Sequence, residues 1–148
     1  MTAFPDGPGT SPGFLLWRVT LRWQRLMTEA LRPLGLTHVQ FVLLACAWWL
    51  SQDGGQAPNQ LTIATQAGVN VKMASEVLRR LEEKGLLEQR TDARDRRAKV
   101  VTVTPEGGRL AEQAISVVEQ ADAGFFSAAP PSIVSALQAL AGDIADSS

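Results

Sequence analysis

The sequence predicts a mainly α-helical fold with one small β-hairpin. In six stretches of the chain, apolar residues recur every three or four positions, which is the spacing of one face of an α-helix. Residues 86–90 and 99–103 instead have the composition of short strands, and a polar, arginine-rich turn at residues 91–98 separates them. The length of 148 residues is that of about one domain. We therefore expect four helices, two strands and two further helices in one folded unit.

The first helix is predicted at residues 14–31 and the second at residues 39–50. In the first helix the arginines lie largely off an apolar face that comprises Leu16, Val19, Trp23, Leu26, Met27 and Ala30. A Pro-Leu-Gly sequence at residues 33–35 ends this helix. Thr37 and Gln40 have the spacing of a capping box, so the apolar run that follows them is expected to form a largely buried helix.

The third and fourth helices are short and closely connected. Asn59 can cap the third, which ends at Gly68 and has an expected inner face of Leu61, Ile63, Ala64 and Ala67. Asn70 can cap the fourth, which ends at Gly85 and has an expected inner face of Ala74, Val77, Leu78 and Leu81. Two helices joined by a short turn that contains Gly form a helix-turn-helix, in which the second helix enters the major groove of DNA. The predicted hairpin follows directly, in the position of a wing.

A long helix and a short one are predicted after the hairpin. Thr104, Pro105 and Glu106 supply an N-cap, a proline for the first helical position and an acidic residue for the first turn. This helix is expected to continue to about residue 127, because two prolines at residues 130–131 then break it. The last helix is predicted from apolar residues at three- and four-residue steps, which are Ile133, Leu137, Leu140 and Ile144.

The charge distribution favours binding to a nucleic acid. The formal net charge is -1, but residues 72–99 contain nine Lys or Arg against six Asp or Glu. Residues 100–148 contain one Arg against six Asp or Glu. A basic segment between neutral and acidic ones is where a phosphate backbone would bind.

Other classes of function are disfavoured. With Cys46 and His38 as the one cysteine and the one histidine, we expect neither a disulfide nor a metal site. Cys46 lies in an apolar run without adjacent Lys or Arg, which should raise its pKa and lower its reactivity. The chain lacks the common phosphate-loop, dinucleotide and hydrolase motifs, so we expect no cofactor and no enzymatic activity.

The sequence also predicts a cytoplasmic protein without a membrane partner. The longest apolar run, residues 41–50, is about half of the roughly 20 residues that a membrane-spanning helix needs. The first residues have no basic start followed by an apolar stretch, which argues against a secretory signal. Their Pro and Gly content instead predicts a flexible leader at residues 1–13.

Three stretches of the sequence resemble the MarR family of bacterial transcriptional regulators. They are LTHVQF at residues 36–41, LRRLEEKGLL at residues 78–87, and DARDRRAK at residues 92–99 followed by TPEG at residues 104–107. The resemblance implies a single domain at residues 14–148. Within it, residues 36–104 would form a winged helix-turn-helix, and residues 14–35 and 105–148 would form dimerisation helices.

The resemblance also implies which residues contact DNA. Asp95 and Arg97 match the family's wing-tip pair, in which the arginine enters the minor groove and the aspartate orients it by a salt bridge. The other basic residues of the wing are expected on phosphates, namely Arg94, Arg96 and Lys99. The outward residues of the fourth helix are expected to face the bases, namely Val71, Lys72, Met73, Ser75, Glu76 and Arg79. Glu76 departs from the family, and we expect it to pair with Arg79 or Arg80 rather than to accept from a cytosine amino group.

A homodimer and a small-molecule pocket follow from the same resemblance. The pocket would lie between the first two helices, the DNA-binding part and the dimerisation helices, and would take a small aromatic or phenolic ligand. Its candidate residues are Trp17, Arg22, His38, Phe41 and Trp48. The candidates for the dimer interface and core are Leu16, Trp23, Leu110, Ile115, Val118, Phe125, Phe126, Ile133, Leu137 and Leu140.

The sequence thus predicts a dimeric regulator, a repressor, that binds double-stranded DNA at a pseudo-palindromic operator and is released by a ligand. Two fourth helices would enter successive major grooves about 34 Å apart. An alternative is a protein-interaction module that keeps a winged-helix shape, and an enzyme is the third and least favoured function. The first two differ in one respect, because replacing Arg97 with Ala would leave an interaction module intact.

Overall fold

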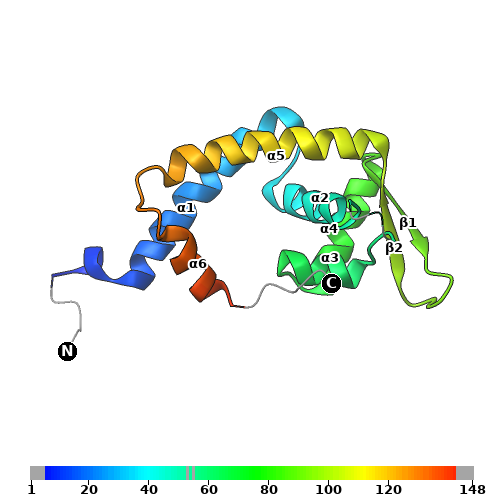
Figure 1. Cartoon of the computed structure of the whole chain (residues 1–148), viewed down its shortest axis with the longest axis horizontal. Helices are drawn as coiled ribbons and strands as arrows, with labels where there is room; N and C mark the ends of the chain where they lie inside the picture. Colours follow the sequence, from blue (N-terminus) through cyan, green and yellow to red (C-terminus); the bar gives the residue numbers. More distant parts are fainter. Residues whose placement is uncertain (1–5, 53, 55, 143–148) are drawn as a thin grey trace.

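The computed structural model describes residues 6–52, 54 and 56–142. Its elements are η1 (Pro8–Thr10), α1 (Pro12–Leu31), η2 (Arg32–Leu34), α2 (His38–Leu50), α3 (Gln60–Ala67), α4 (Val71–Glu83), β1 (Leu87–Thr91), β2 (Lys99–Val103), α5 (Pro105–Phe126) and α6 (Ile133–Ala141). The predicted order of helices and strands is confirmed. In Figure 1, α5 runs along the top and joins the end of the molecule that carries α6 to the end that carries α2, α3, α4 and the hairpin.

The element bounds differ little from the predicted ones. α1 begins two residues earlier than predicted, because Ser11 caps it and Pro12 occupies its first position. Residues 6–13 of the expected leader therefore include a 3-10 turn and the start of α1. Residues 1–5 of that leader, the loop residues 53 and 55, and Ile144 of the predicted last helix lie outside the described residues.

Four helices begin at the capping residues that the sequence indicates. The capping box is present, since the Thr37 side chain accepts from the backbone N–H of Gln40 and the Gln40 side chain accepts from that of Thr37, each at 3.2 Å. Three further side chains cap helices by accepting from the backbone three residues on, namely Asn59, Asn70 and Thr104. The starts of α2, α3, α4 and α5 are thus each fixed by a capping side chain.

One apolar core joins α1, α2, α3, α4, α5 and both strands. Its largest fully buried side chains are Met27, Leu31, Leu43, Leu44, Ile63, Leu78, Leu81, Leu87 and Val101. The C-terminal half of α1 belongs to this core, but Leu16 and Val19 of the predicted apolar face are exposed. No single described helix is long and apolar enough to cross a membrane. Pro12–Leu34 and His38–Leu50 meet that criterion together only as a pair bent by 72°.

The wing is a two-stranded antiparallel hairpin that has a third backbone contact. Leu87 lies opposite Val103, and Thr91 lies opposite Lys99. Asn59, just before α3, forms an isolated bridge with Val100. The contact of residues 58–59 with β2, which the sequence analysis did not predict, attaches the hairpin to the start of α3.

Two adjacent glycines in α5 should respond oppositely to substitution. A Cβ at Gly107 would lie 1.8 Å from the carbonyl oxygen of Leu86, whereas a Cβ at Gly108 would lie 3.7 Å from Trp48, an ordinary contact. We expect Gly107→Ala to lower the free energy of unfolding by at least about 1–3 kcal/mol. Gly108→Ala should raise it by up to about 1 kcal/mol, because Ala favours the helix. Urea denaturation of both variants measures this, and equal effects would contradict the packing described.

Candidate nucleic-acid interface

α4 presents one polar face to solvent and buries the other. Ala74, Leu78 and Leu81 are buried, as predicted, and Val77 is half-buried. Among the predicted base-facing residues, Ser75 is half-buried and the others are exposed, including Val71 at 44% and Met73 at 40%. Exposed apolar side chains at the start of a recognition helix can contact thymine methyl groups.

Two aspartates shape the tip of the wing. The Asp92 carboxylate accepts a hydrogen bond from the backbone N–H of Arg94 at 2.9 Å, and the Asp95 carboxylate accepts one from that of Arg97 at 3.0 Å. The expected Asp95–Arg97 salt bridge is absent from the described ion pairs. Aspartate competes for nearby backbone donors, so Asp95 orders the turn and leaves the guanidinium of Arg97 exposed.

The ion pair expected between Glu76 and an arginine of α4 is also not the one observed. The guanidinium of Arg79 lies 3.5 Å from the carboxylate of Glu83, and within the described chain Glu76 pairs with neither Arg79 nor Arg80. Both partners of the observed pair are more than half exposed, so the pair contributes little to stability. Within the part of the chain that the structure describes, the exposed Glu76 carboxylate on α4 has no ion-pair partner.

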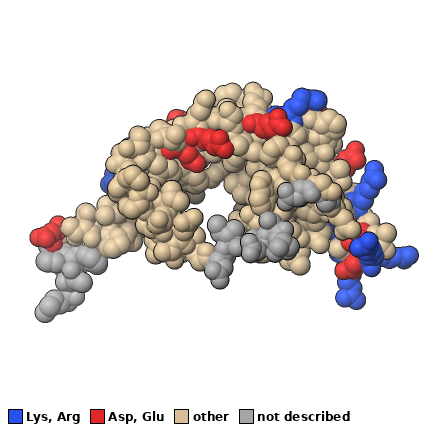
Figure 2. Space-filling view, viewed as in Figure 1, with Lys and Arg blue, Asp and Glu red and all other residues tan. Residues whose placement is uncertain are grey.

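A groove of about 260 Å³ brings the wing and the helix-turn-helix together. The wing contributes Asp95, Arg97, Ala98 and Lys99, the start of α4 contributes Val71, and the start of α3 contributes Asn59, Gln60 and Leu61. Figure 2 shows Lys and Arg side chains gathered at the end of the molecule that carries the hairpin. Cationic side chains and apolar helix residues thus line one concave surface.

The start of α3 is the part of this groove that the sequence analysis missed. Leu61 was expected on the inner face of α3 but is 61% exposed, while Ile63 and Ala64 are buried. Leu61 and Ile63 are two residues apart, which is about 200° around a helix, so they cannot face the same side. Helical geometry, applied strictly, would have placed Leu61 outward.

A cluster of aromatic and polar side chains connects α1, α2 and α5. The indole N–H of Trp23 on α1 donates to the Asp122 carboxylate on α5 at 2.8 Å. The Trp23 ring meets the His38 ring edge-on at 4.9 Å, and His38 stacks on Phe41 at 6.5 Å. Burial lowers the pKa of His38, and the nearby Asp122 partly opposes that shift. His38, the first residue of α2, is therefore half-buried against Trp23 of α1.

Folding stability should fall as His38 becomes protonated. The pKa of His38 in the folded chain lies below its ordinary value of 6.5. As the pH falls below about 6.5, the unfolded chain therefore binds a proton at His38 before the folded chain does. Stability contributed by neutral His38 is thus present above that pH and is lost as the pH falls toward the folded-state pKa. Because the chain has one histidine, an NMR titration of its imidazole signals measures this directly. A pKa at or above 6.5 in the folded protein would contradict it.

The five candidate pocket residues do not meet in one described cavity. Trp17 and Arg22 share a groove of about 340 Å³ on α1. His38 lines a separate cavity of about 410 Å³ at the α1–α2 junction. Phe41 is a core residue, and Trp48 packs near Gly108 of α5. A single chain therefore brings Trp17 and Arg22 together in one groove and stacks His38 on Phe41, but it does not join the two pairs in one cavity.

Neither the Cys46 thiol nor the metal-ligating residue types form a reactive site among the described residues. Cys46 is half-buried, and burial raises the pKa of its thiol, as predicted. Among the described residues, no group of three or more His, Cys, Asp or Glu could hold a metal ion. The groove between the wing and the helix-turn-helix, which combines cationic wing residues with the starts of α3 and α4, is thus the candidate site.

Several known proteins are similar to this chain in sequence. A sequence model of the MarR family matches residues 36–99. An uncharacterised HTH-type transcriptional regulator of Bacillus subtilis strain 168, YdcH, is 42% identical over 125 residues, which cover 84% of this chain and 84% of YdcH. The HTH-type transcriptional repressor Rv2887 of Mycobacterium tuberculosis strain H37Rv is 37% identical over 111 residues, 75% of this chain and 76% of Rv2887.

Solved structures of other proteins are also similar to this chain in their fold. BpsR of Bordetella bronchiseptica superposes with a TM-score of 0.78 at 28% identity, covering 90% of this chain and 95% of BpsR. That structure is described as showing the mechanism by which 6-hydroxynicotinic acid regulates the DNA binding of BpsR.

Proposed function

The chain belongs to the MarR family of winged helix-turn-helix transcriptional regulators, which bind DNA and are not enzymes, and we propose that it is a homodimeric repressor. One observation carries the proposal: the wing-tip residues Arg97 and Lys99 line the same groove as Val71 at the start of α4. A helix in the major groove and an arginine in the adjacent minor groove need such a common surface. The repressor role is supported by the name of Rv2887.

The dimer is supported by apolar surface at the end of the molecule that carries α6. α6 has no buried residue, and Val134, Leu137 and Leu140 are 60%, 41% and 80% exposed. The N-terminal half of α1 exposes further apolar side chains, which are Phe14, Leu15, Leu16, Trp17, Val19 and Leu21. A contiguous exposed apolar patch marks an interaction site. A second copy would bury it by two-fold symmetry and present two α4 helices to a pseudo-palindromic site.

We further propose that a small aromatic or phenolic ligand releases the protein from DNA. The groove that holds Trp17 and Arg22 also contains Phe14, Arg18 and Arg25, so it combines two aromatic rings with three guanidinium groups at the edge of the face that the second copy would cover. Such a surface suits an aromatic acid, the class to which the effector of BpsR belongs. A ligand releases DNA only if it binds more tightly to the conformation that does not fit the operator.

Selection of duplexes from a random DNA pool tests the function. The full-length protein should enrich a pseudo-palindromic sequence and bind it as a dimer, with an affinity that falls steeply as salt rises. Enrichment of a sequence without two-fold symmetry would contradict the dimeric model. No salt-dependent binding to any duplex would remove the regulator function altogether.

A further inference from the structure

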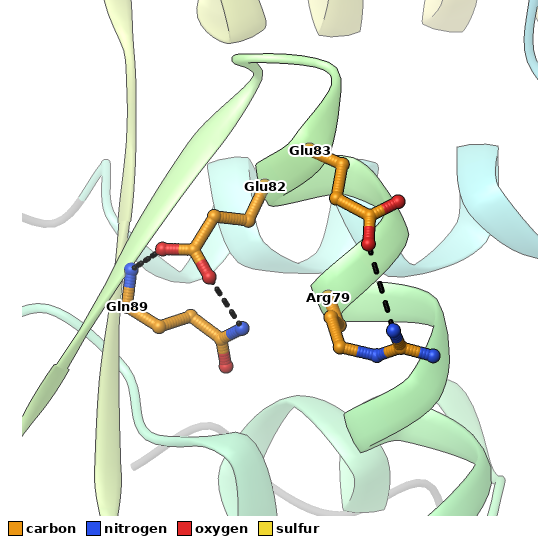
Figure 3. A network of polar contacts seen from close by, with 4 residues as sticks. All are labelled: Arg79, Glu82, Glu83 and Gln89. Atoms are coloured by element: carbon orange, nitrogen blue, oxygen red, sulfur yellow. Dashed lines mark hydrogen bonds and ion pairs between the residues drawn. The ribbon is translucent and has the colours of Figure 1, made fainter.

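A chain of polar contacts connects α4, β1 and α3 beside the DNA-binding groove. The two carboxylate oxygens of Glu82 accept from the backbone N–H of Gln89 at 2.9 Å and from its side-chain amide at 3.3 Å. Figure 3 shows Glu82 reaching from α4 to the strand. The side-chain oxygen of Gln89 in turn accepts from the amide of Gln60 at 2.5 Å. All three residues are half-buried.

These contacts hold both edges of the wing hairpin. Gln89 and Val101 lie opposite one another in the hairpin. The N–H of Gln89 points to Glu82, and the N–H of Val101 donates to the carbonyl of Pro58 at 2.8 Å. One edge is therefore attached to α4 and the other to the segment before α3. Gln60, which also lines the groove, joins the two attachments.

We propose that Glu82 is a positioning residue, which acts through Gln89 to fix the wing tip relative to α4. The inference rests on the proposed function. The base of the hairpin is anchored by Leu87 and Val101 in the core and by its connections to α4 and α5, whereas its tip at residues 92–98 makes no backbone hydrogen bond to another element among the described contacts. A charged acceptor makes a stronger hydrogen bond than a neutral one, and loss of the carboxylate would leave a half-buried N–H without a partner.

An electrostatic role and a positioning role of Glu82 predict opposite effects of its removal on DNA binding. Glu82 places a negative charge on the helix that faces DNA, so its removal should tighten binding if charge alone matters. If Glu82 positions the wing, its removal should weaken binding instead. Glu83, the next residue, is the matched control, because Glu83→Ala removes the same charge from a surface pair with Arg79.

A double-mutant cycle tests the positioning. The probe is the duplex that the unaltered protein selects from a random pool. Glu82→Ala should weaken binding to it by about thirtyfold or more, whereas Glu83→Ala should leave binding equal or slightly tighter. Arg97→Ala should cost much less in the Glu82→Ala background than in the unaltered protein, because a displaced wing no longer delivers Arg97. An equal cost of Arg97→Ala in both backgrounds would overturn the proposal.

Two further measurements separate positioning from folding and from DNA binding. Glu82→Gln keeps an acceptor for the Gln89 N–H without the charge, so it should retain the coupling to Arg97 even if Glu82→Ala is unstable. Loss of that coupling in a folded Glu82→Gln variant would contradict the proposal. Amide hydrogen exchange of Gln89 should be faster in Glu82→Ala than in Glu83→Ala, with no DNA present. If the protein selects no duplex, the proposed function fails, while this exchange result still decides whether Glu82 holds the wing.

Discussion

Replacing Leu140 with Asp is expected to convert the dimer into monomers. Leu140 is 80% exposed in a single chain, so a partner must cover it for the dimer to be stable. Burial of a leucine side chain stabilises by about 1.5–3 kcal/mol, and a two-fold interface contains it twice, which gives about 3–6 kcal/mol per dimer. Sedimentation at micromolar concentration should show a dimer for the unaltered protein and a monomer for Leu140→Asp.

Ser135 provides the control on the same helix. It is exposed and lies two residues from Leu137, about 200° around α6, so Ser135→Asp should leave the dimer intact. A monomeric unaltered protein, or equal effects of the two substitutions, would show that this face of α6 is not the interface.

Arg97→Ala is expected to weaken operator binding by about 1–3 kcal/mol for each wing, or about 2–6 kcal/mol for a dimer. The exposed guanidinium of Arg97 lines the groove shared with α4, and a narrow minor groove favours the weakly hydrated guanidinium. Arg97→Lys should retain the salt dependence of binding but lose much of the sequence preference, because it keeps the charge without the planar donors. Fluorescence anisotropy with the selected duplex measures both.

Arg109 is the charge-matched control for this prediction. It is exposed on α5 and does not line the groove, so Arg109→Ala removes one positive charge elsewhere. If the two alanine variants lose the same affinity, the wing contributes only general charge. If Arg97→Ala has no effect, the chain instead fits the protein-interaction alternative.

Local signals in the sequence were sufficient to predict the fold. Thr37, Asn59, Asn70 and Thr104 all act as the N-caps that their positions indicated, since capping depends on residues within one turn. The hairpin followed from two short runs of strand-forming residues around a polar turn, and its first strand is displaced by one residue from the prediction.

Contacts between distant residues could not be predicted in this way. The Trp23–Asp122 hydrogen bond joins residues 99 apart, and the Gln60–Gln89 bond joins residues 29 apart. Neither has a local pattern, because any polar residue in those helices and in β1 could have found another partner. The bridge of Asn59 to β2 is a backbone contact, which side-chain identity does not specify.

The sequence indicated where the wing lies better than it indicated which charged residues pair. Arg97 and Lys99 do lie beside α4, but Asp95 caps the turn instead of pairing with Arg97. Arg79 had carboxylates available on either side along α4, at positions 76 and 83, and it pairs with Glu83. Ion pairs at an exposed helix surface differ by a few tenths of a kcal/mol, so the sequence alone does not determine which one forms.

Dimethyl sulfate protection of the selected duplex tests the central claim most directly, because it reports guanine N7 in the major groove and adenine N3 in the minor groove. If α4 and the wing tip form one surface that the dimer presents twice, each half-site should show major-groove protection flanked by minor-groove protection. The two half-sites should be related by two-fold symmetry, about one helical turn apart. Protection confined to one groove, or two half-sites in the same orientation, would contradict this account.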